Sequence, residues 1–191
     1  WMNYAYEPVV YAHFLKLAAG IDITQLTDWD KLFYPEASDY EKKHVDSLLS
    51  PLENNHFIVC SLETGGRAKD WPLSHWLGLF DELQQFNKTV VIIGSHSDRY
   101  KNVDLPNNVI DLRGKTNLLE TGYVIDKADL LINGCSFPIH VANAMDTPVI
   151  GLYGSQPDYR GKPQRIYASI CSPEPCAPCD VLFNSPGWCE K

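Results

Sequence analysis

The run Phe57-Ile58-Val59-Cys60 opens a stretch in which short apolar segments alternate with helical patterns. The later segments are equally short and rich in β-branched residues, and they cover residues 89–93, 109–112, 129–132 and 148–153. Segments of this length with amphipathic helices between them are typical of buried parallel strands joined by crossovers. We therefore expect an α/β fold with an open parallel sheet, in which ligands bind beyond the carboxyl ends of the strands.

The rest of the chain is organised around this stretch. Residues 1–56 contain two helical patterns, one from near Pro8 to Gly20 and one after the capping-box sequence Ser38-Asp39-Tyr40-Glu41. Neither pattern carries a chemical motif, so we expect residues 1–56 to be a helical connector. The sheet domain is expected over residues 57–168, followed by a Cys-rich tail over residues 169–191.

Composition limits the class of protein. The 191 residues carry a net charge of −8, which argues against binding to long nucleic acid because that needs a broad basic face. No apolar run is long enough to span a bilayer, and the start of the chain lacks the features of a signal peptide. We expect a cytoplasmic protein. Because the first residue is Trp1, we also expect a piece of a longer chain.

The positive charges follow the expected strands. Eight of the 16 Lys and Arg residues lie in loops after these strands or at the entry of the next helix; they are Arg67, Lys69, Arg99, Lys101, Arg113, Lys115, Arg160 and Lys162. One interpretation is that solvated loops simply hold charges. The other is that an anionic small ligand is held at one edge of the sheet.

The loop after the first strand fits the second interpretation. Gly65 and Gly66 allow a close backbone approach, while Arg67 and Lys69 supply positive charge. The helix that begins near residues 71–72, with Asp70 as a candidate cap, directs free N–H groups and its positive dipole end to the same place. This arrangement suits a diphosphate, although an ordinary strand-to-helix loop remains the alternative.

The loop after the fourth strand is the second candidate. Ser136 and the N–H groups at the entry of the next helix are suited to phosphate oxygens, and His140 follows about one turn later. A single His at such a place is often only a packed or capping residue. The standard dinucleotide fingerprint Gly-x-Gly-x-x-Gly is absent between any expected strand and helix.

Three motifs in order then resemble one family. Lys69-Asp70-Trp71-Pro72, Gly114-Lys115-Thr116 and Ser136-x-Pro138-x-His140 follow each other as in the C-terminal half of glycosyltransferase family 9, the heptosyltransferase-like enzymes of lipopolysaccharide synthesis. The resemblance runs from about Phe57 to Gly154. It implies a two-domain GT-B fold, of which residues 57–168 would form the Rossmann-like, three-layer domain that binds a nucleotide-diphospho-sugar, commonly ADP-heptose.

The resemblance also implies roles for single residues. Lys69 would contact the diphosphate, Ser136 and His140 the phosphates or the transferred sugar, and Asp98 the ribose. The backbone from Leu112 to Lys115 would line the base pocket. The general base and the acceptor site would lie in an N-terminal domain that this chain lacks, so we expect the fragment alone to be inactive. No carboxylate-rich metal motif is present, and no cofactor is expected for transfer.

Two departures from the family pattern leave other functions open. Aligned on His140, the chain has Cys135 where the family has the Asp that contacts the donor sugar, and Phe137 where the family has Gly. The alternatives are a non-catalytic nucleotide-binding module and an enzyme related to nucleotide-sugar epimerases. The acceptor implied for an active member is lipopolysaccharide-like and lies at the inner face of the bacterial inner membrane.

The tail contains a separate candidate site. Four of its residues are thiols with a central Cys-x2-Cys spacing: Cys171, Cys176, Cys179 and Cys189. Such a set is suited to a structural zinc or iron ion. Packed thiols are an equally good interpretation, and disulfides are a third, although they are uncommon in the cytosol.

Overall fold

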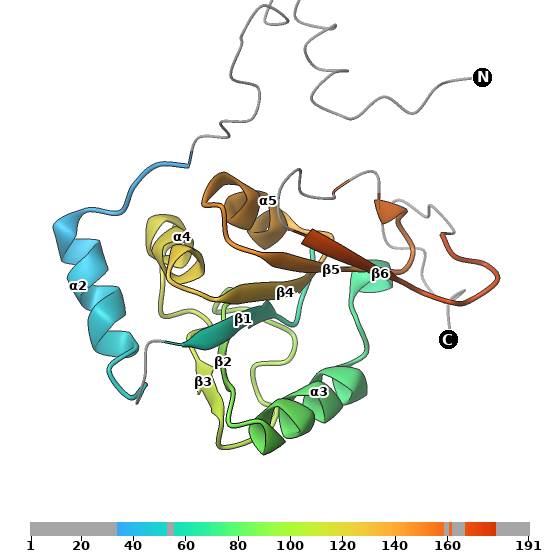
Figure 1. The fold of residues 1–191 in the computed structure, drawn as a ribbon, viewed down its shortest axis with the longest axis horizontal. Coiled ribbons are helices and arrows are strands. Elements are labelled where there is room, and N and C mark those ends of the chain that lie inside the picture. The colour runs from blue at the N-terminus through green and yellow to red at the C-terminus, as the bar shows by residue number, and fades with distance from the viewer. Residues whose placement is uncertain (1–33, 53–55, 159–160, 162–166, 179–191) are drawn as a thin grey trace, which may run out of the picture. The chain divides into compact units, whose positions relative to one another are not determined.

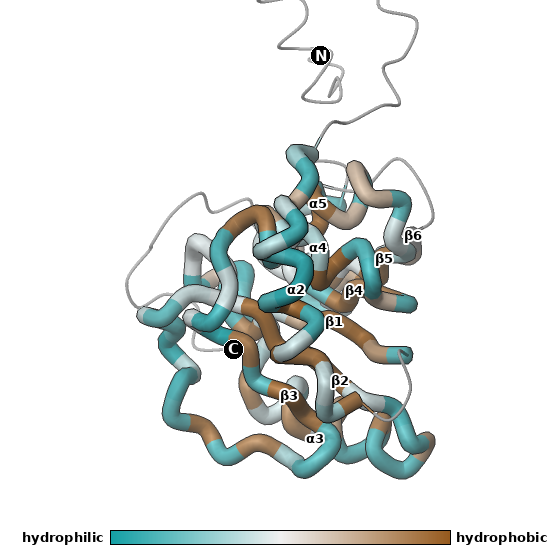
Figure 2. Tube along the Cα trace, turned by 90° about the vertical axis from the view of Figure 1, so that its left-hand side faces the viewer, coloured by the Kyte–Doolittle hydropathy of each residue, from teal (hydrophilic) through white to brown (hydrophobic). Residues whose placement is uncertain are grey.

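The computed structural model describes residues 34–52, 56–158, 161 and 167–178. These residues form a six-stranded sheet in which every neighbouring pair of strands is parallel. The strands lie in the order β3-β2-β1-β4-β5-β6 (Figures 1 and 2) and cover β1 (Phe57–Ser61), β2 (Thr89–Ile92), β3 (Val109–Asp111), β4 (Leu130–Gly134), β5 (Val149–Tyr153) and β6 (Tyr167–Cys171). The order reverses between β1 and β4, which is the switch point at which such sheets bind ligands.

Helices cover both faces of this sheet, so the described residues form three layers. One face is covered by α2 (Asp39–Leu48), α4 (Leu118–Asp126) and α5 (Phe137–Ala144), and the other by α3 (Leu73–Gln85) (Figure 1). A short 3-10 helix, η2 (Arg67–Lys69), precedes α3. The expected α/β class and Rossmann-like, three-layer sheet are confirmed.

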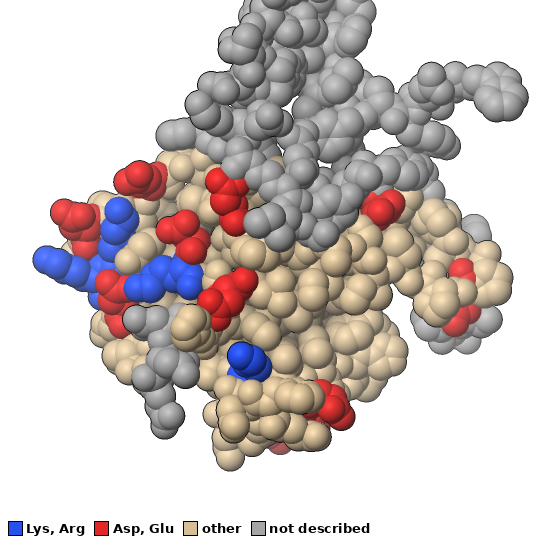
Figure 3. Space-filling model, in the orientation of Figure 1, with Lys and Arg blue, Asp and Glu red and all other residues tan. Residues whose placement is uncertain are grey.

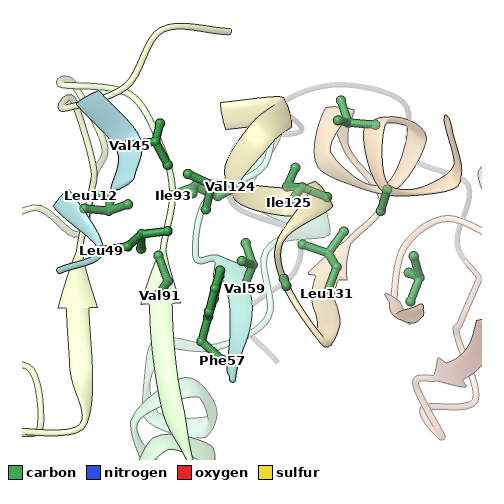
Figure 4. Packing of buried hydrophobic residues seen from close by; sticks show 14 of the residues in the cluster. Val45, Leu49, Phe57, Val59, Val91, Ile93, Leu112, Val124, Ile125 and Leu131 are labelled. Atoms are coloured by element: carbon green, nitrogen blue, oxygen red, sulfur yellow. The ribbon is translucent and has the colours of Figure 1, made fainter. Parts of the chain in front are cut away.

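The two faces have separate cores because side chains alternate along each strand. On the α2–α4–α5 face, Phe57 and Val59 of β1 pack with Val124 and Ile125 of α4 (Figure 4). On the α3 face, Trp76 packs in a cluster that also contains Ile58 and Ile92. Burial of each such side chain stabilises the fold by about 1.5–3 kcal/mol. Both faces of β1 are thus fixed, and the position of the loop after it is fixed with them.

Helix α2 belongs to the sheet domain. The predicted capping box is present, with Ser38 Oγ accepting from the Glu41 amide and the Glu41 carboxylate accepting from the Ser38 amide. Val45 and Leu49 are buried in the core of the α4 face. Charged side chains gather over α2 on the face shown in Figure 3. Helix α2, which lies in the predicted connector of residues 1–56, thus packs on the sheet. The first predicted helix lies outside the described residues.

Strand β6 lies across the boundary expected between residues 168 and 169. It pairs in parallel with β5 from Val149↔Tyr167 to Tyr153↔Cys171. The sequence pattern missed this strand because Tyr167-Ala168-Ser169-Ile170-Cys171 contains a single β-branched residue. Residues 169–171 therefore belong to the sheet. In the part of the chain that the structure describes, no helix has the length and apolar character needed to cross a membrane.

Candidate functional site

The loops after β1 and β4 meet at the switch point of the sheet. A Cβ atom added to Gly134, the last residue of β4, would lie 3.0 Å from Thr64 Cγ2 and 3.2 Å from the Lys69 carbonyl oxygen. Lys69 Nζ donates a hydrogen bond to the Cys135 carbonyl oxygen at 3.2 Å. The structure thus brings Lys69 beside the residue that precedes Ser136. Glycine at position 134 is what permits this close approach.

Hydrogen bonds of Thr64 to other residues of the loop after β1 stabilise this loop. This buried residue donates from Oγ1 to the Gly66 carbonyl oxygen at 2.9 Å. Its Oγ1 and its amide also donate to Asp70 Oδ1, at 2.8 and 2.7 Å. Asp70 therefore closes the loop on itself, and the residue that precedes α3 is Pro72, which supplies no side-chain cap. The prediction that Asp70 caps this helix is wrong, because its carboxylate finds nearer donors in its own loop.

The predicted ligand residues of this loop are exposed to different degrees. Gly65 is exposed, and a Cβ added there would meet nothing within 4 Å. Gly66 is buried beside the Lys69 side chain, with 3.7 Å between its added Cβ and Lys69 Cε. Arg67 is exposed on η2. The loop thus presents open backbone at Gly65 next to two cations.

The loop after β4 is ordered by Asn133, a residue to which the sequence motifs assign no role. Asn133 is fully buried, and its Oδ1 accepts from the Ser61 amide of β1 at 2.9 Å. Its Nδ2 donates to Ser136 Oγ at 2.8 Å and to the Gly134 carbonyl oxygen at 2.9 Å. Ser136 is the N-cap residue of α5, and His140 lies exposed one turn into that helix. A polar residue at the end of an apolar strand was the available signal for Asn133.

Two of the eight loop cations are already matched by carboxylates. The Arg99 guanidinium pairs with Glu63 at 2.8 Å and with Asp70. The Arg113 guanidinium pairs with Asp111 at 2.7 Å and with Asp98 at 3.4 Å. Arg99 and Arg113 therefore hold loops together, so these two cations do not count toward the anionic ligand of the second interpretation. Arg160 and Lys162 lie outside the described residues.

Asp98, the residue implied at the ribose, faces Arg113. Its side chain is 1% exposed, and it also accepts from the Tyr100 amide at 2.8 Å. Burial raises the pKa of Asp98 above its ordinary value, although the Tyr100 amide and Arg113 act against this shift. Its second oxygen accepts no hydrogen bond from the described residues. A role at the ribose stays a prediction for this position.

The loop implied at the base pocket lies at the same edge, three strands away from β4. Gly114 has φ +70, a conformation that favours glycine, and a Cβ added there would lie 2.8 Å from the His96 Cα atom. The Gly114 amide donates to the Gly94 carbonyl oxygen at 2.9 Å. The loops after β2 and β3 are therefore in contact, and Lys115 is exposed beside them.

The two residues that depart from the family pattern point to other segments. A Cβ added to Gly161 would lie 2.6 Å from Cys135 Sγ, which places this thiol against the segment after β5. The Phe137 ring lies 6.1 Å from the Tyr34 ring, measured between centroids, and 45% of the residue is exposed. Phe137 thus packs beside the segment that leads into α2.

The predicted metal site lies only partly within the described residues. Cys171 ends β6, Cys176 follows it in a turn, and both are exposed. Cys179 and Cys189 lie outside the described residues. Within the described ranges, no group of three or more His, Cys, Asp or Glu side chains is placed to hold a metal ion.

A parallel sheet with this strand order and with ordered loops at its switch point defines the Rossmann-like class of α/β domains. Over residues 6–185 the chain matches glycosyltransferase family 9 (heptosyltransferase), and it belongs to this family. This confirms the resemblance stated from the sequence motifs.

Curated relatives agree with this assignment. The chain is 29% identical over 152 residues to the lipopolysaccharide core heptosyltransferase OpsX of Haemophilus influenzae, covering 75% of this chain and 39% of the relative. It is 28% identical over 157 residues to lipopolysaccharide heptosyltransferase 2 of Salmonella typhimurium, covering 75% of this chain and 43% of the relative. The chain therefore spans less than half the length of these relatives.

Solved structures share the fold. A glycosyl transferase family 9 structure from Veillonella parvula superposes with a TM-score of 0.72 at 16% identity, covering 90% of this chain and 50% of the other. ADP-heptose lipopolysaccharide heptosyltransferase II of E. coli superposes with a TM-score of 0.61 at 24% identity, covering 73% and 46%. The iron-containing dodecameric glycosyltransferase TibC of E. coli superposes at 0.50 with 19% identity, covering 62% and 33%. The domain is the Rossmann-like half of a GT-B fold.

Proposed function

We propose that this chain is the C-terminal, donor-binding half of a GT-B glycosyltransferase. Its donor would be a nucleotide-diphospho-sugar such as ADP-heptose, and its acceptor lipopolysaccharide or a similar glycan. The observation that carries the proposal is the contact from Lys69 Nζ to the Cys135 carbonyl oxygen, because it sets a cation beside Ser136 and the entry of α5. The names of the relatives, which are lipopolysaccharide heptosyltransferases, support the choice of donor and acceptor.

The chemistry needs positive groups at the leaving diphosphate. When the anomeric C–O bond breaks, the bonding electrons stay on the diphosphate oxygen, and preorganised donors there lower the barrier. Lys69, the open backbone at Gly65 and the N–H groups at the entry of α5 are the donors available. A phosphate oxygen is a stronger acceptor for Lys69 Nζ than the neutral carbonyl oxygen of Cys135. These groups are proposed to act without a divalent ion.

The second substrate is proposed to bind elsewhere. A general base that takes the acceptor proton is expected in an N-terminal half, together with the acceptor site. On this proposal the isolated chain binds the nucleotide and does not transfer sugar. The complete enzyme would meet its acceptor at the cytoplasmic face of the inner membrane.

A second candidate function rests on Cys135. The family pattern has Asp at this position, and here a thiol lies against Gly161 instead. A thiol cannot replace a carboxylate as an acceptor for sugar hydroxyl groups. The second candidate is therefore a domain that holds the nucleotide without transferring the sugar.

The four tail cysteines are proposed to hold a structural zinc or iron ion. Cys171 and Cys176 are exposed and lie five residues apart at the end of β6, so both are accessible to a metal. Thiolates are suited to either metal. The similarity to an iron-containing glycosyltransferase supports the proposal. Such an ion would hold the tail beside β6 and would take no part in transfer.

The experiment is donor turnover by the full-length protein. The protein is incubated with ADP-heptose and a lipopolysaccharide-core acceptor, and mass spectrometry follows the released nucleotide and the product. Release of ADP together with a glycosylated acceptor supports the transferase. Binding without release selects the non-catalytic module, and an isomerised donor sugar selects an epimerase-like enzyme. Absence of nucleotide binding refutes the proposed site.

A further inference from the structure

The residue beside Lys69 in the chain carries the opposite charge. Asp70 follows the cation that the proposed function places at the diphosphate, and an exposed carboxylate there would repel a phosphate. Its side chain is only 5% exposed. The structure therefore has to bury and neutralise this carboxylate while leaving Lys69 accessible.

Three donor groups from two neighbouring loops neutralise the Asp70 carboxylate. Asp70 Oδ1 accepts from the Thr64 amide at 2.7 Å and from Thr64 Oγ1 at 2.8 Å. Asp70 Oδ2 accepts from the guanidinium of Arg99. Both oxygens of the carboxylate are thus occupied by donors from the loops after β1 and β2, and one of these donors carries a full positive charge.

Arg99 is itself fixed in place by several further contacts. Its Nη1 lies 2.8 Å from Glu63 Oε1, and its backbone amide donates to Glu63 Oε2 at 2.8 Å. Its Nη2 also donates to the Thr64 carbonyl oxygen at 3.3 Å. A planar guanidinium can contact Glu63, Asp70 and the Thr64 carbonyl oxygen at once, whereas a lysine ammonium at the same place cannot. With Glu63 and Asp70 matched, Arg99 has no charge left for a ligand.

We propose that Arg99 is a positioning residue for the diphosphate site. By holding Asp70 and Thr64, it fixes the loop that carries Lys69 and keeps the Asp70 carboxylate away from the phosphates. This inference rests on the proposed function. On this inference, the preference for a nucleoside diphosphate over the monophosphate depends on Arg99, although Arg99 does not touch the ligand.

The test measures that preference by calorimetry with the full chain. ADP, GDP and UDP are titrated first, and the one that binds is compared with its own monophosphate. Arg99→Gln should weaken diphosphate binding about tenfold and monophosphate binding less than twofold, since Lys69 is proposed to act at the diphosphate. Lys88→Gln, at the opposite edge of the sheet, removes the same charge and should change neither affinity.

The double variant separates positioning from direct contact. Arg99→Gln leaves the carboxylates of Glu63 and Asp70 without their guanidinium partner. Adding Asp70→Asn removes the one that is next to Lys69 in the chain, so diphosphate affinity should recover at least threefold relative to Arg99→Gln. A residue that binds the phosphate directly would show no such rescue. Thermal unfolding of each variant checks the fold, and Arg99→Lys, which keeps the charge and loses the planar fork, takes the place of Arg99→Gln if the latter does not fold.

The outcomes are distinct. Equal loss of diphosphate and monophosphate affinity, or absence of rescue in the double variant, overturns the role of Arg99. If the wild-type chain binds a diphosphate and Arg99→Gln binds it equally well, this inference fails while the proposed function stands. If the wild-type chain binds no nucleoside diphosphate, both fail.

Discussion

Gly134 offers a sharp test of how the two loops of the site fit together. Replacing it with alanine adds one methyl group at the end of β4, 3.0 Å from Thr64 Cγ2 and 3.2 Å from the Lys69 carbonyl oxygen. The Thr64 side chain cannot rotate away without losing its hydrogen bonds to Gly66 and Asp70. The carbonyl oxygen belongs to the backbone, so the loop after β1 would have to move.

Two opposing effects set the change in the free energy of unfolding for Gly134→Ala. Overpacking of this kind costs about 1–3 kcal/mol. Replacing glycine in a strand recovers about 0.5–1 kcal/mol through the lower entropy of the unfolded chain. We expect Gly134→Ala to lower the free energy of unfolding by about 1 kcal/mol, with about 2.5 kcal/mol as the upper bound from these two effects. It should also weaken nucleotide binding because Lys69 moves with its loop.

The control is the same substitution at Gly78. This residue is exposed in α3, and a Cβ added there would meet nothing within 4 Å. Gly78→Ala should raise the free energy of unfolding by about 0.5–1 kcal/mol, because alanine favours the helix. Urea unfolding followed by circular dichroism measures both variants. If Gly134→Ala is as stable as Gly78→Ala, the close packing of the two loops is refuted.

Three further predictions concern binding, pH and metal. Lys69→Ala should weaken nucleoside-diphosphate binding roughly ten- to a hundredfold by calorimetry, as for the loss of one charge-assisted contact, while Lys88→Ala binds normally; equal affinity would remove Lys69 from the site. Burial pushes the pKa of Asp111 upward, but the hydrogen bonds from Arg113 prevail and hold the pKa below its ordinary value. Its stabilising effect is therefore complete above the unfolded pKa and is lost as the pH falls through the folded one. The stability difference between wild type and Asp111→Asn, measured by urea unfolding, should be largest near neutral pH and shrink below about pH 4, and a constant difference would contradict this sign. Cys176→Ser should lower the zinc or iron content measured by mass spectrometry on reduced protein, and metal-free wild-type protein would contradict the tail site.

The strands could be predicted from the sequence because burial on both faces leaves a strong signal. Runs such as Val90-Val91-Ile92 are apolar at every position, and packing requires this of a central parallel strand. Strand β6 left a weaker signal. It lies beyond β5 in the sheet, and Ile170 is 56% exposed. Its place was set by pairing with β5, which is a non-local contact.

The location of the candidate site could be predicted from the sequence, but its hydrogen bonds and ion pairs could not. Loops after strands reach the same edge of a parallel sheet, so Lys69 and Ser136 could be assigned to one edge. The partners of Arg99 and Arg113 could not be predicted, because a cation near several carboxylates chooses among them by geometry. The role of Asn133 could not be predicted either, because its side chain links β1 to the loop after β4, and these partners are brought together only by the fold.

The proposed diphosphate site at the loops after β1 and β4 is tested by mapping where a nucleoside diphosphate binds. Amide resonances of the labelled chain are compared with and without ADP, with GDP and UDP as alternatives. We expect shifts concentrated at residues 64–70 and 134–137, with little change at the opposite edge around Lys88. Shifts confined to other surfaces, or no shifts with any of the three nucleotides, would contradict it.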